Sequence, residues 1–321
     1  MAPLPPSPSP SLPPAALSIY ELARLNCRER LLVPPIQWTG RHVELLQFSF
    51  EEPCPAPRSE KSGFPITGYQ HAKTLFTFSG PGWREGTIED ILAEPECPLE
   101  SRTGLKFYFN RRLVSILPCL TFHVRGDNPV RGPVAAYIDR VHIEKLRMDY
   151  AWARQPRRPS SPSRALCKFR ARRLKPPVPH RDPYIVAMLI AVAVNQRNAL
   201  PQKRSEDCLD PSSTFLAQVL LTDGNDKENI HLFSTDIASS FLDKIDHPSL
   251  RPPPSVTPTI VIRHTLVPYR PLKTFRKRLL LLLLPTLRDY DCEAIEPPPT
   301  KSLRDIPCSG QKDIENEGDL F

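Results

Sequence analysis

The sequence predicts an α+β fold: a small mixed sheet packed against a buried helix, with extensive proline-rich loops and disordered termini. Residues 184–194 form the longest apolar run and contain no polar stripe, which is typical of a helix buried on all sides. Short segments rich in β-branched and aromatic residues, which favour strands, occur on both sides of this run. Forty of the 321 residues are proline, so much of the chain must lie outside helices and central strands.

The apolar run begins with favourable helix-start residues. The carboxylate of Asp182 can cap the first turn, and Pro183 falls at the first helical position, where its missing N–H costs nothing. The alanines, leucine and methionine of the run favour helix over strand. A membrane-spanning helix needs roughly 18 or more apolar residues. The run is shorter, so we expect a core helix that ends before Pro201.

The first third of the chain predicts two helices and two strands. Residues 1–17 read as a disordered proline-rich tail, with Pro-x-x-Pro spacings that an SH3-type groove could accept. Ser18 and Glu21 form a capping box, which indicates a helix over 19–32. The elements expected next are a strand over 42–50, a strand over 71–78 and a short helix over 87–93.

The middle of the chain predicts a strand pair and an amphipathic helix. Residues 104–109 and 113–124 are rich in aromatic and β-branched residues, and 110–112 could form the turn between them. Pro118 indicates that the second strand lies at an edge or bends there. Residues 134–153 place apolar side chains at helical spacing between charged ones.

The last third predicts alternating strands and helices after the buried helix. Strands are expected at 214–221 and 230–234, because the turn residues 223–226 separate them. Asp236 can cap a helix that runs to Ile245. A strand over 259–267 and a helix over 272–284 complete the order.

These segments suggest five regions, and the sequence leaves open whether the two structured ones share a core. The boundaries are a disordered proline-rich tail at 1–17, an N-terminal α+β region at 18–153, a basic Pro/Ser-rich linker at 154–181, a C-terminal α+β region at 182–287 and an acidic disordered tail at 288–321.

Charge is distributed unevenly along the chain, whose formal net charge is +8. Residues 154–175 contain many arginines and lysines and no acid. Three interpretations remain open: a solvated linker, a nuclear-localisation patch, or a salt-sensitive, non-specific nucleic-acid contact. The candidate residues of this patch are Lys168, Arg170, Arg172, Arg173 and Lys175.

The eight cysteines are widely spaced and include no Cys-x-x-Cys pair. Structural zinc sites and dense disulfide scaffolds both need closer spacing. We therefore expect free thiols in a reducing compartment and no metal site. The first residues also lack the charged and apolar segments of a signal peptide, so an intracellular location, nuclear or cytoplasmic, is expected.

Catalytic and cofactor signatures are weak throughout. Gly63 and Gly68 have the spacing of a phosphate-binding loop, but Tyr69 and Gln70 replace its Lys and hydroxyl residues. The segment order approaches a restriction-endonuclease-like fold, yet no Asp/Glu-x-Lys occurs to support metal-dependent cleavage. We therefore assign no catalytic, cofactor-binding or metal residues.

The sequence favours a non-enzymatic interaction protein over an enzyme. A protein partner could bind through the proline-rich tail or the basic linker, and no membrane association is expected. The alternative is a nucleic-acid-binding protein or a diverged restriction-endonuclease-like nuclease. A salt-dependent contact of the basic patch with nucleic acid would support that alternative.

Residues 182–191, followed by 231–237 and 241–245, resemble a group of uncharacterised proteins of filamentous fungi. The resemblance covers residues 180–285. It implies a eukaryotic intracellular setting and brings no activity, cofactor or site residues with it.

Overall fold

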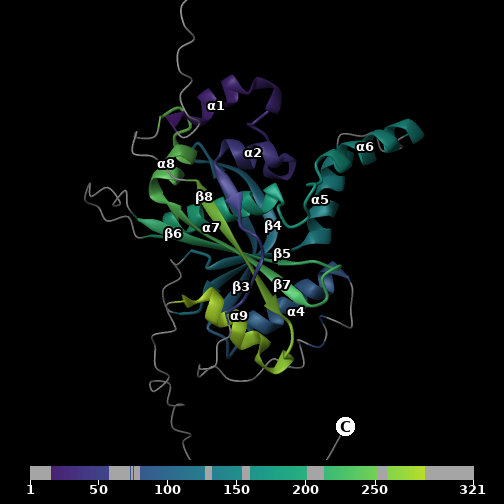
Figure 1. Cartoon of the computed structure of the whole chain (residues 1–321), viewed down its shortest axis with the longest axis vertical. Helices are drawn as coiled ribbons and strands as arrows, with labels where there is room; N and C mark the ends of the chain where they lie inside the picture. Colours follow the sequence, from purple (N-terminus) through teal and green to yellow (C-terminus); the bar gives the residue numbers. More distant parts are fainter. Residues whose placement is uncertain are drawn as a thin grey trace, which may run out of the picture.

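A mixed eight-stranded sheet is the centre of the computed structural model of the chain (Figure 1). The structure describes residues 16–57, 73, 75, 80–126, 132–153, 160–200, 213–251 and 259–285. The sheet has the order β1-β8-β7-β6-β5-β4-β3, and β2 also pairs with β8. The strands are β1 (Phe48–Phe50), β2 (Cys54–Pro55), β3 (Leu99–Phe109), β4 (Arg112–Val124), β5 (Ala135–Asp139), β6 (Thr214–Thr222), β7 (Asn229–Ala238) and β8 (Ile260–Pro268).

The sheet contains both parallel and antiparallel strand pairs. β5 pairs with β6 in parallel, and β1 and β2 each pair in parallel with β8. All other neighbours are antiparallel. Strands from both predicted α+β regions therefore lie in one sheet, and the predicted α+β class is confirmed.

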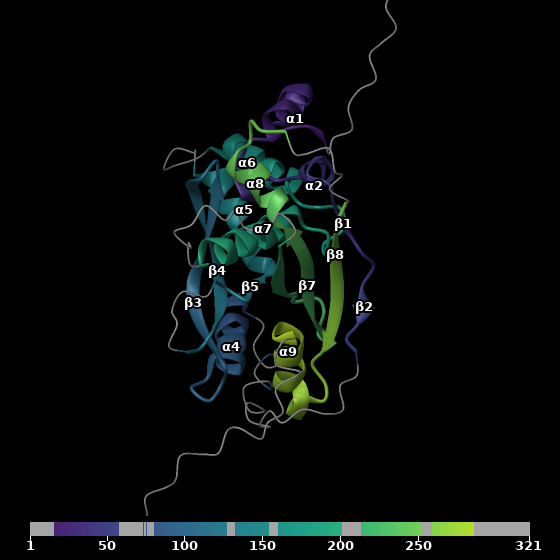
Figure 2. The same cartoon turned by 90° about the vertical axis from the view of Figure 1, so that its left-hand side faces the viewer.

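Helices cover both faces of the sheet (Figures 1 and 2). Alternate residues of β5 show this, because Ala136 and Ile138 pack into one apolar cluster and Ala135 and Tyr137 into another. One face carries α4 (Pro81–Ala93) and α9 (Phe275–Leu283). The other face carries α1 (Ile19–Leu25), α2 (Gly40–Leu45), α5 (Arg140–Trp152), α7 (Pro183–Asn198) and α8 (Ser239–Asp246).

The remaining helical elements lie at the margins. Helix α6 (Ser161–Arg173) packs against α5 through the small cluster of Ala151, Cys167 and Ala171. The short 3-10 helices are η2 (Cys27–Glu29), η3 (Pro35–Gln37) and η4 (Leu272–Thr274). Among the described residues, no helix is both long enough and apolar enough to cross a membrane.

Helix α7 is the predicted buried helix, and the structure confirms it. Every residue from Tyr184 to Val194 is at most 1% exposed. Asp182 caps the helix by accepting a hydrogen bond from the main-chain N–H of Tyr184. The same carboxylate forms two hydrogen bonds with the guanidinium of Arg147 on α5, at 2.6 and 2.8 Å. Both side chains are buried, so this ion pair fixes the start of α7 against α5.

The polar last turn of α7 is tied to its neighbours by side-chain bonds. Asn195 donates to the carbonyl of Lys106 on β3, and Gln196 donates to the carbonyls of Pro133 and Leu216. Arg197 bridges to Asp243 and Asp246 on α8. The polar residues that end the apolar run therefore hold three surrounding elements in place.

Several predicted elements have different boundaries or types. The predicted strand over 42–50 is wrong in its first half, where α2 precedes the short strand β1. The predicted amphipathic helix over 134–153 is wrong in its first part, where Ala135–Asp139 form β5, a fully buried central strand, and the helix α5 begins at Arg140. The predicted linker over 154–181 contains α6, whose first turn is capped by Ser160. These assignments are wrong for one reason: each segment is stabilised by contacts with other parts of the chain, which its local sequence does not reveal.

Other boundaries shift by smaller amounts. The predicted helix over 19–32 ends at Leu25, although its capping box is present. Helix α4 begins at Pro81, before the predicted start at Thr87. β7 continues to Ala238, so Asp236 lies on a strand and does not cap α8. Most of the predicted strand over 71–78, residues 1–15 of the predicted proline-rich tail and the predicted acidic tail over 288–321 lie outside the described residues. Leu17, which the prediction placed in the disordered tail, is buried in the apolar core.

Pro118 bends its strand as the sequence predicts. Leu105 of β3 pairs with Leu117, whereas Thr103 pairs with Leu120, so β4 contributes an extra residue between them. Such a bulge accommodates proline because one residue there leaves the hydrogen-bond ladder. The pairing of β4 with β5 begins at Leu120, beyond the bulge.

We predict that Asp182→Ala lowers the free energy of unfolding by about 3–5 kcal/mol, because it leaves the buried charge of Arg147 without a partner and removes the α7 cap. Urea unfolding followed by circular dichroism measures this loss. Asp149→Ala, at an exposed position of α5, is the matched control and should change stability by less than about 0.5 kcal/mol. Equal stabilities of the two variants would contradict the role of the pair.

Candidate functional site

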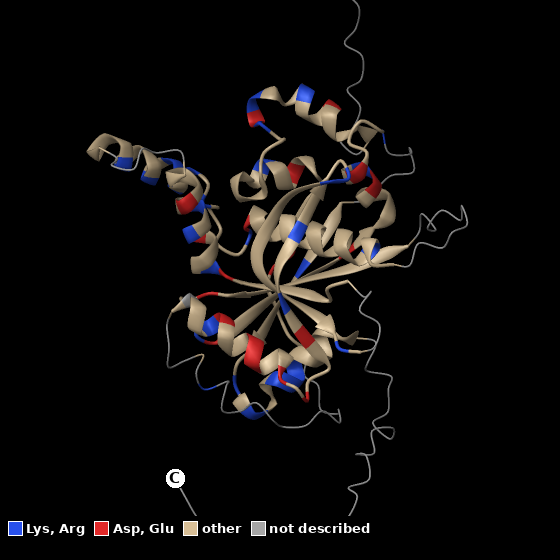
Figure 3. Ribbon diagram, turned by 180° about the vertical axis from the view of Figure 1, so that it is seen from behind, with Lys and Arg blue, Asp and Glu red and all other residues tan. Residues whose placement is uncertain are grey.

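Helix α6 carries the basic residues that the sequence singled out, and it projects from the body of the molecule (Figure 3). All five predicted patch residues are exposed. Spacing divides them between two sides of the helix. Lys168 and Arg172 lie one turn apart on one side, with Lys175 just beyond the helix, whereas Arg170 and Arg173 line a cleft on the other.

The exposed surface of α6 is also partly apolar. Leu166 is 44% exposed and Phe169 is 57% exposed, whereas only Cys167 and Ala171 of the helix are buried. The guanidinium carbon of Arg173 lies 5.9 Å from the centre of the Phe169 ring. The helix therefore presents apolar and cationic groups together.

The cleft beside α6, which we call the arginine cleft, lies between this helix and the N-terminal segment. It has a volume of about 580 Å³. Arg28 and Arg30 line it from the N-terminal side, opposite Arg170 and Arg173, with Glu29 as its one lining carboxylate. All four arginines are exposed, and none forms an ion pair within the described part of the chain. Four guanidinium groups against one carboxylate make the cleft a candidate site for an anion.

A second polar group, the strand-end cluster, lies where β5 and β6 end side by side. Asp139 accepts hydrogen bonds from Nε of Arg84 and from the hydroxyl of Thr222, each at 2.7 Å. Because Thr222 donates to Asp139, the hydroxyl of Tyr137 donates to Thr222 at 2.8 Å. Burial raises the pKa of Tyr137, which keeps that hydroxyl protonated. The chain of bonds places each hydrogen on a defined donor.

The second carboxylate of the strand-end cluster is also engaged. Asp223 accepts from Arg140 at 2.5 Å and from the main-chain N–H of Asn225 at 2.9 Å. Asp139 additionally caps α5 by accepting from the N–H of Val141. Both carboxylates are therefore used in capping, turn formation and arginine pairing. The cluster joins α4, α5 and the sheet.

Three histidines stack beside the strand-end cluster. Nδ1 of His231 lies 3.0 Å from Nε2 of His264, and the His180 ring stacks on His231 with centroids 4.2 Å apart. Burial first, and the neighbouring histidines second, lower the pKa of His231 to about 4 and that of His264 to about 3. Asp226 lies 3.3 Å from Nε2 of His231 without hydrogen-bond geometry. Near neutral pH the stack is uncharged.

The residues on which a nuclease would depend do not converge. Asp223 lies beside the histidine stack, whereas Asp236 lies five residues along β7 from His231 and pairs with Arg263. Strand geometry separates His231 and Asp236 by roughly 17 Å. Among the described residues, no group of three His, Cys, Asp or Glu side chains could hold a metal ion. The five described cysteines are free thiols, and Gly63 and Gly68 lie outside the described part.

The arginine cleft was only partly visible in the sequence. The basic residues of α6 were found from their density, but Arg28 and Arg30 lie about 140 residues earlier among mixed charges. Asp139 and Arg84 carried no motif, and only the folded chain brings them together. No pattern of neighbouring residues predicts such pairs, because the order of strands in the sheet decides which residues come together.

Comparison with known proteins gives no relative: no protein-family model matches the chain, and no curated protein matches it.

We predict that acid destabilises this protein partly through the histidine stack. The unfolded chain binds protons near the usual histidine pKa of 6.5, whereas His231 takes one up near pH 4, so stability falls as pH is lowered through this interval. Between pH 6.5 and 4, the free energy of unfolding of His231→Gln should fall by on the order of 2–3 kcal/mol less than that of the natural protein.

Urea unfolding at a series of pH values measures the effect as the difference in slope between variant and natural protein. His142→Gln on α5 is the control, since this histidine lies outside the stack and is only half-buried. The same slope in His231→Gln and the natural protein would show that the stack does not couple to folding.

Proposed function

We propose that this chain is a non-enzymatic interaction protein that binds an acidic protein partner through helix α6. The observation that carries the proposal is the surface of α6, where Leu166 and Phe169 stand exposed among arginines and lysines. Aromatic residues and arginine are enriched at protein interfaces. A helix held only by Cys167 and Ala171 leaves most of its circumference available to a partner.

The positive charge of α6 defines which partner surface would be complementary to it. Lys168 and Arg172 form no ion pair with any described residue, and Lys175 pairs with Glu144 on α5 at 2.8 Å. A partner that presents carboxylates on either side of an apolar contact would match both the cations and Phe169. The cations would steer the encounter, and the apolar contact would slow dissociation.

A protein partner fits the composition of this surface better than nucleic acid does. Single-stranded nucleic acid is bound by several stacked aromatic residues along a basic groove. On α6 the one aromatic side chain is Phe169, and Leu166 beside it offers nothing to a phosphate or a base edge. Nucleic-acid binding would depend on the cations alone and would leave the apolar residues without a role.

We predict that the full chain, probed against an array of short synthetic peptides, selects peptides that combine acidic and apolar residues. Phe169→Ala should weaken binding of the selected peptides about tenfold, because it removes the apolar anchor. Lys168→Glu should weaken binding and reduce its salt dependence, because Arg172 remains as a cation on the same side of the helix. Fluorescence anisotropy of labelled peptides measures both effects.

Two matched controls are available in the chain. Leu25→Ala removes an apolar side chain that is 66% exposed on α1, and Lys145→Glu reverses an exposed charge on α5. Neither should change peptide binding. Tighter binding of a labelled DNA duplex than of any peptide, with no effect of Phe169→Ala, would refute the proposal and favour nucleic acid.

A further inference from the structure

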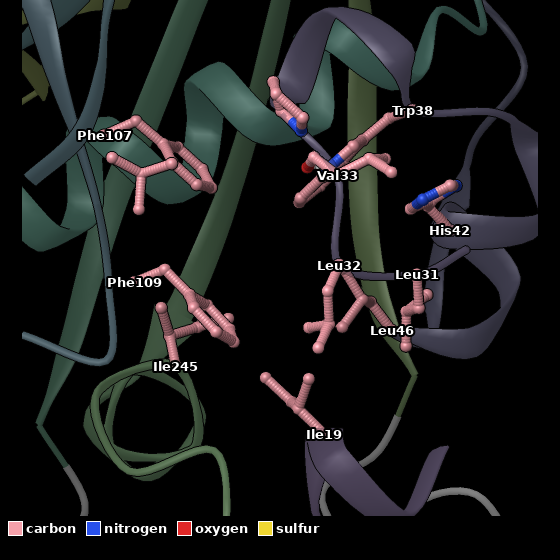
Figure 4. Close-up of a pocket in the computed structure, with 12 residues that line it drawn as sticks. Ile19, Leu31, Leu32, Val33, Trp38, His42, Leu46, Phe107, Phe109 and Ile245 are labelled. Atoms are coloured by element: carbon pink, nitrogen blue, oxygen red, sulfur yellow. Dashed lines mark hydrogen bonds between the residues drawn. The ribbon is translucent and has the colours of Figure 1, made fainter. Parts of the chain in front are cut away.

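An apolar hollow, which we call the apolar pocket, lies between the N-terminal helices and the β3–β4 hairpin (Figure 4). Its volume is about 190 Å³. Phe107 and Phe109 of β3 face Leu32 and Val33 across the space. Leu32 and Val114 are 53% and 50% exposed, so they mark its opening to solvent. The other lining residues are Ile19, Leu31, Pro34, Trp38, His42, Leu46 and Ile245.

The aromatic wall of the apolar pocket is held in place before any ligand binds. The indole N–H of Trp38 donates to the carbonyl of Val33 at 3.2 Å. Phe107 meets the indole edge-on with ring centroids 5.9 Å apart, and His42 stacks on it at 5.6 Å. A wall that is already ordered saves the entropy cost of ordering it on binding.

His42 is the one ionisable side chain of this pocket, and its protonation is defined. Nδ1 accepts a hydrogen bond from the main-chain N–H of Thr39 at 3.0 Å. Burial lowers the pKa of His42, although the nearby carbonyl of Arg30 opposes this, so the ring is neutral near pH 7. The hydrogen is therefore on Nε2, which is buried near the carbonyl of Arg30.

The apolar pocket and the arginine cleft adjoin. Val33 and His42 line both, so these side chains form the border that the two hollows share. One hollow is lined almost wholly by carbon, and the other carries Arg28, Arg30, Arg170 and Arg173. An apolar compartment beside a cationic one is complementary to a molecule with a hydrocarbon chain and an anionic head.

We propose that the two hollows together bind a long-chain fatty acid, with its hydrocarbon chain in the apolar pocket and its carboxylate in the arginine cleft. Burial of the methylene groups in the apolar pocket favours binding. Guanidinium groups form charge-assisted, bidentate hydrogen bonds with a carboxylate. A neutral lipid would leave the arginines unpaired, and a polyanion would leave the pocket empty.

Dodecanoate and the full chain test this site directly. Trp83→Phe and Trp152→Phe together leave Trp38, which lines the pocket, as the only tryptophan. We expect dodecanoate to change Trp38 fluorescence saturably. Dodecanol should bind more weakly, and dodecylammonium should not compete. No saturable change, or equal competition by dodecylammonium, would overturn the proposal.

Matched variants separate the two hollows. Val114→Asp places a carboxylate at the opening and should weaken dodecanoate binding at least about tenfold. Leu113→Asp is the control, because this neighbour is 49% exposed and does not line the pocket, so affinity should change less than about twofold. Equal losses in the two variants would refute the assignment of the site.

Removing charge from the cleft tests the head group. Arg28→Ala with Arg170→Ala should weaken binding of dodecanoate about tenfold and leave dodecanol unchanged. An equal effect on both ligands would show that the arginines do not hold the carboxylate. Phe169→Ala should leave dodecanoate binding intact, so this test can fail or succeed independently of the partner interaction on α6.

Discussion

Complete burial of α7 is the constraint on which the rest of the architecture depends. A helix that is apolar around its whole circumference must be covered on every side, because exposed apolar surface is costly. The sheet covers one side, and α2, α5 and α8 cover the others. The Arg147–Asp182 pair sets where α5 crosses the start of α7, and Arg197 sets where α8 meets its end. Ion pairs therefore hold both ends of α7, and the residues between them pack in the apolar core.

The candidate sites lie where this covering layer ends. The apolar pocket forms between α1, α2 and the part of β3 that extends past α7, and the arginine cleft forms where α6 continues beyond α5. Among the described residues, the carboxylates at the strand ends are paired, unlike the arginines of the cleft: Asp139 pairs with Arg84, and Asp223 pairs with Arg140. Cations near the helical margin remain exposed. The arginines of the cleft are therefore accessible to a partner or ligand, whereas Arg84 and Arg140 are already paired.

Sequence patterns predicted the elements that rely on local interactions. The apolar run predicted α7. Ser18 and Glu21 predicted the start of α1, because capping residues act within one turn. Elements stabilised at long range were missed. β5 consists of Ala-Ala-Tyr-Ile-Asp, a short run without alternation, and it is a strand because β4 and β6 pair with it on both sides. Residues 161–173 were assigned to a linker because they are basic, yet α5 provides the small apolar contact that holds them as α6.

The same division applies to the candidate sites. Local composition alone identified the basic residues of α6 and the absence of familiar catalytic motifs. The sequence also determined that α7 is buried, since no other arrangement would hide an unbroken apolar surface. Tertiary structure alone decided that Arg28 and Arg30 face α6 across a cleft and that the cleft adjoins an apolar pocket. Those contacts join residues that are far apart in the sequence, and their geometry follows from strand order and helix packing, which no local pattern of residues encodes.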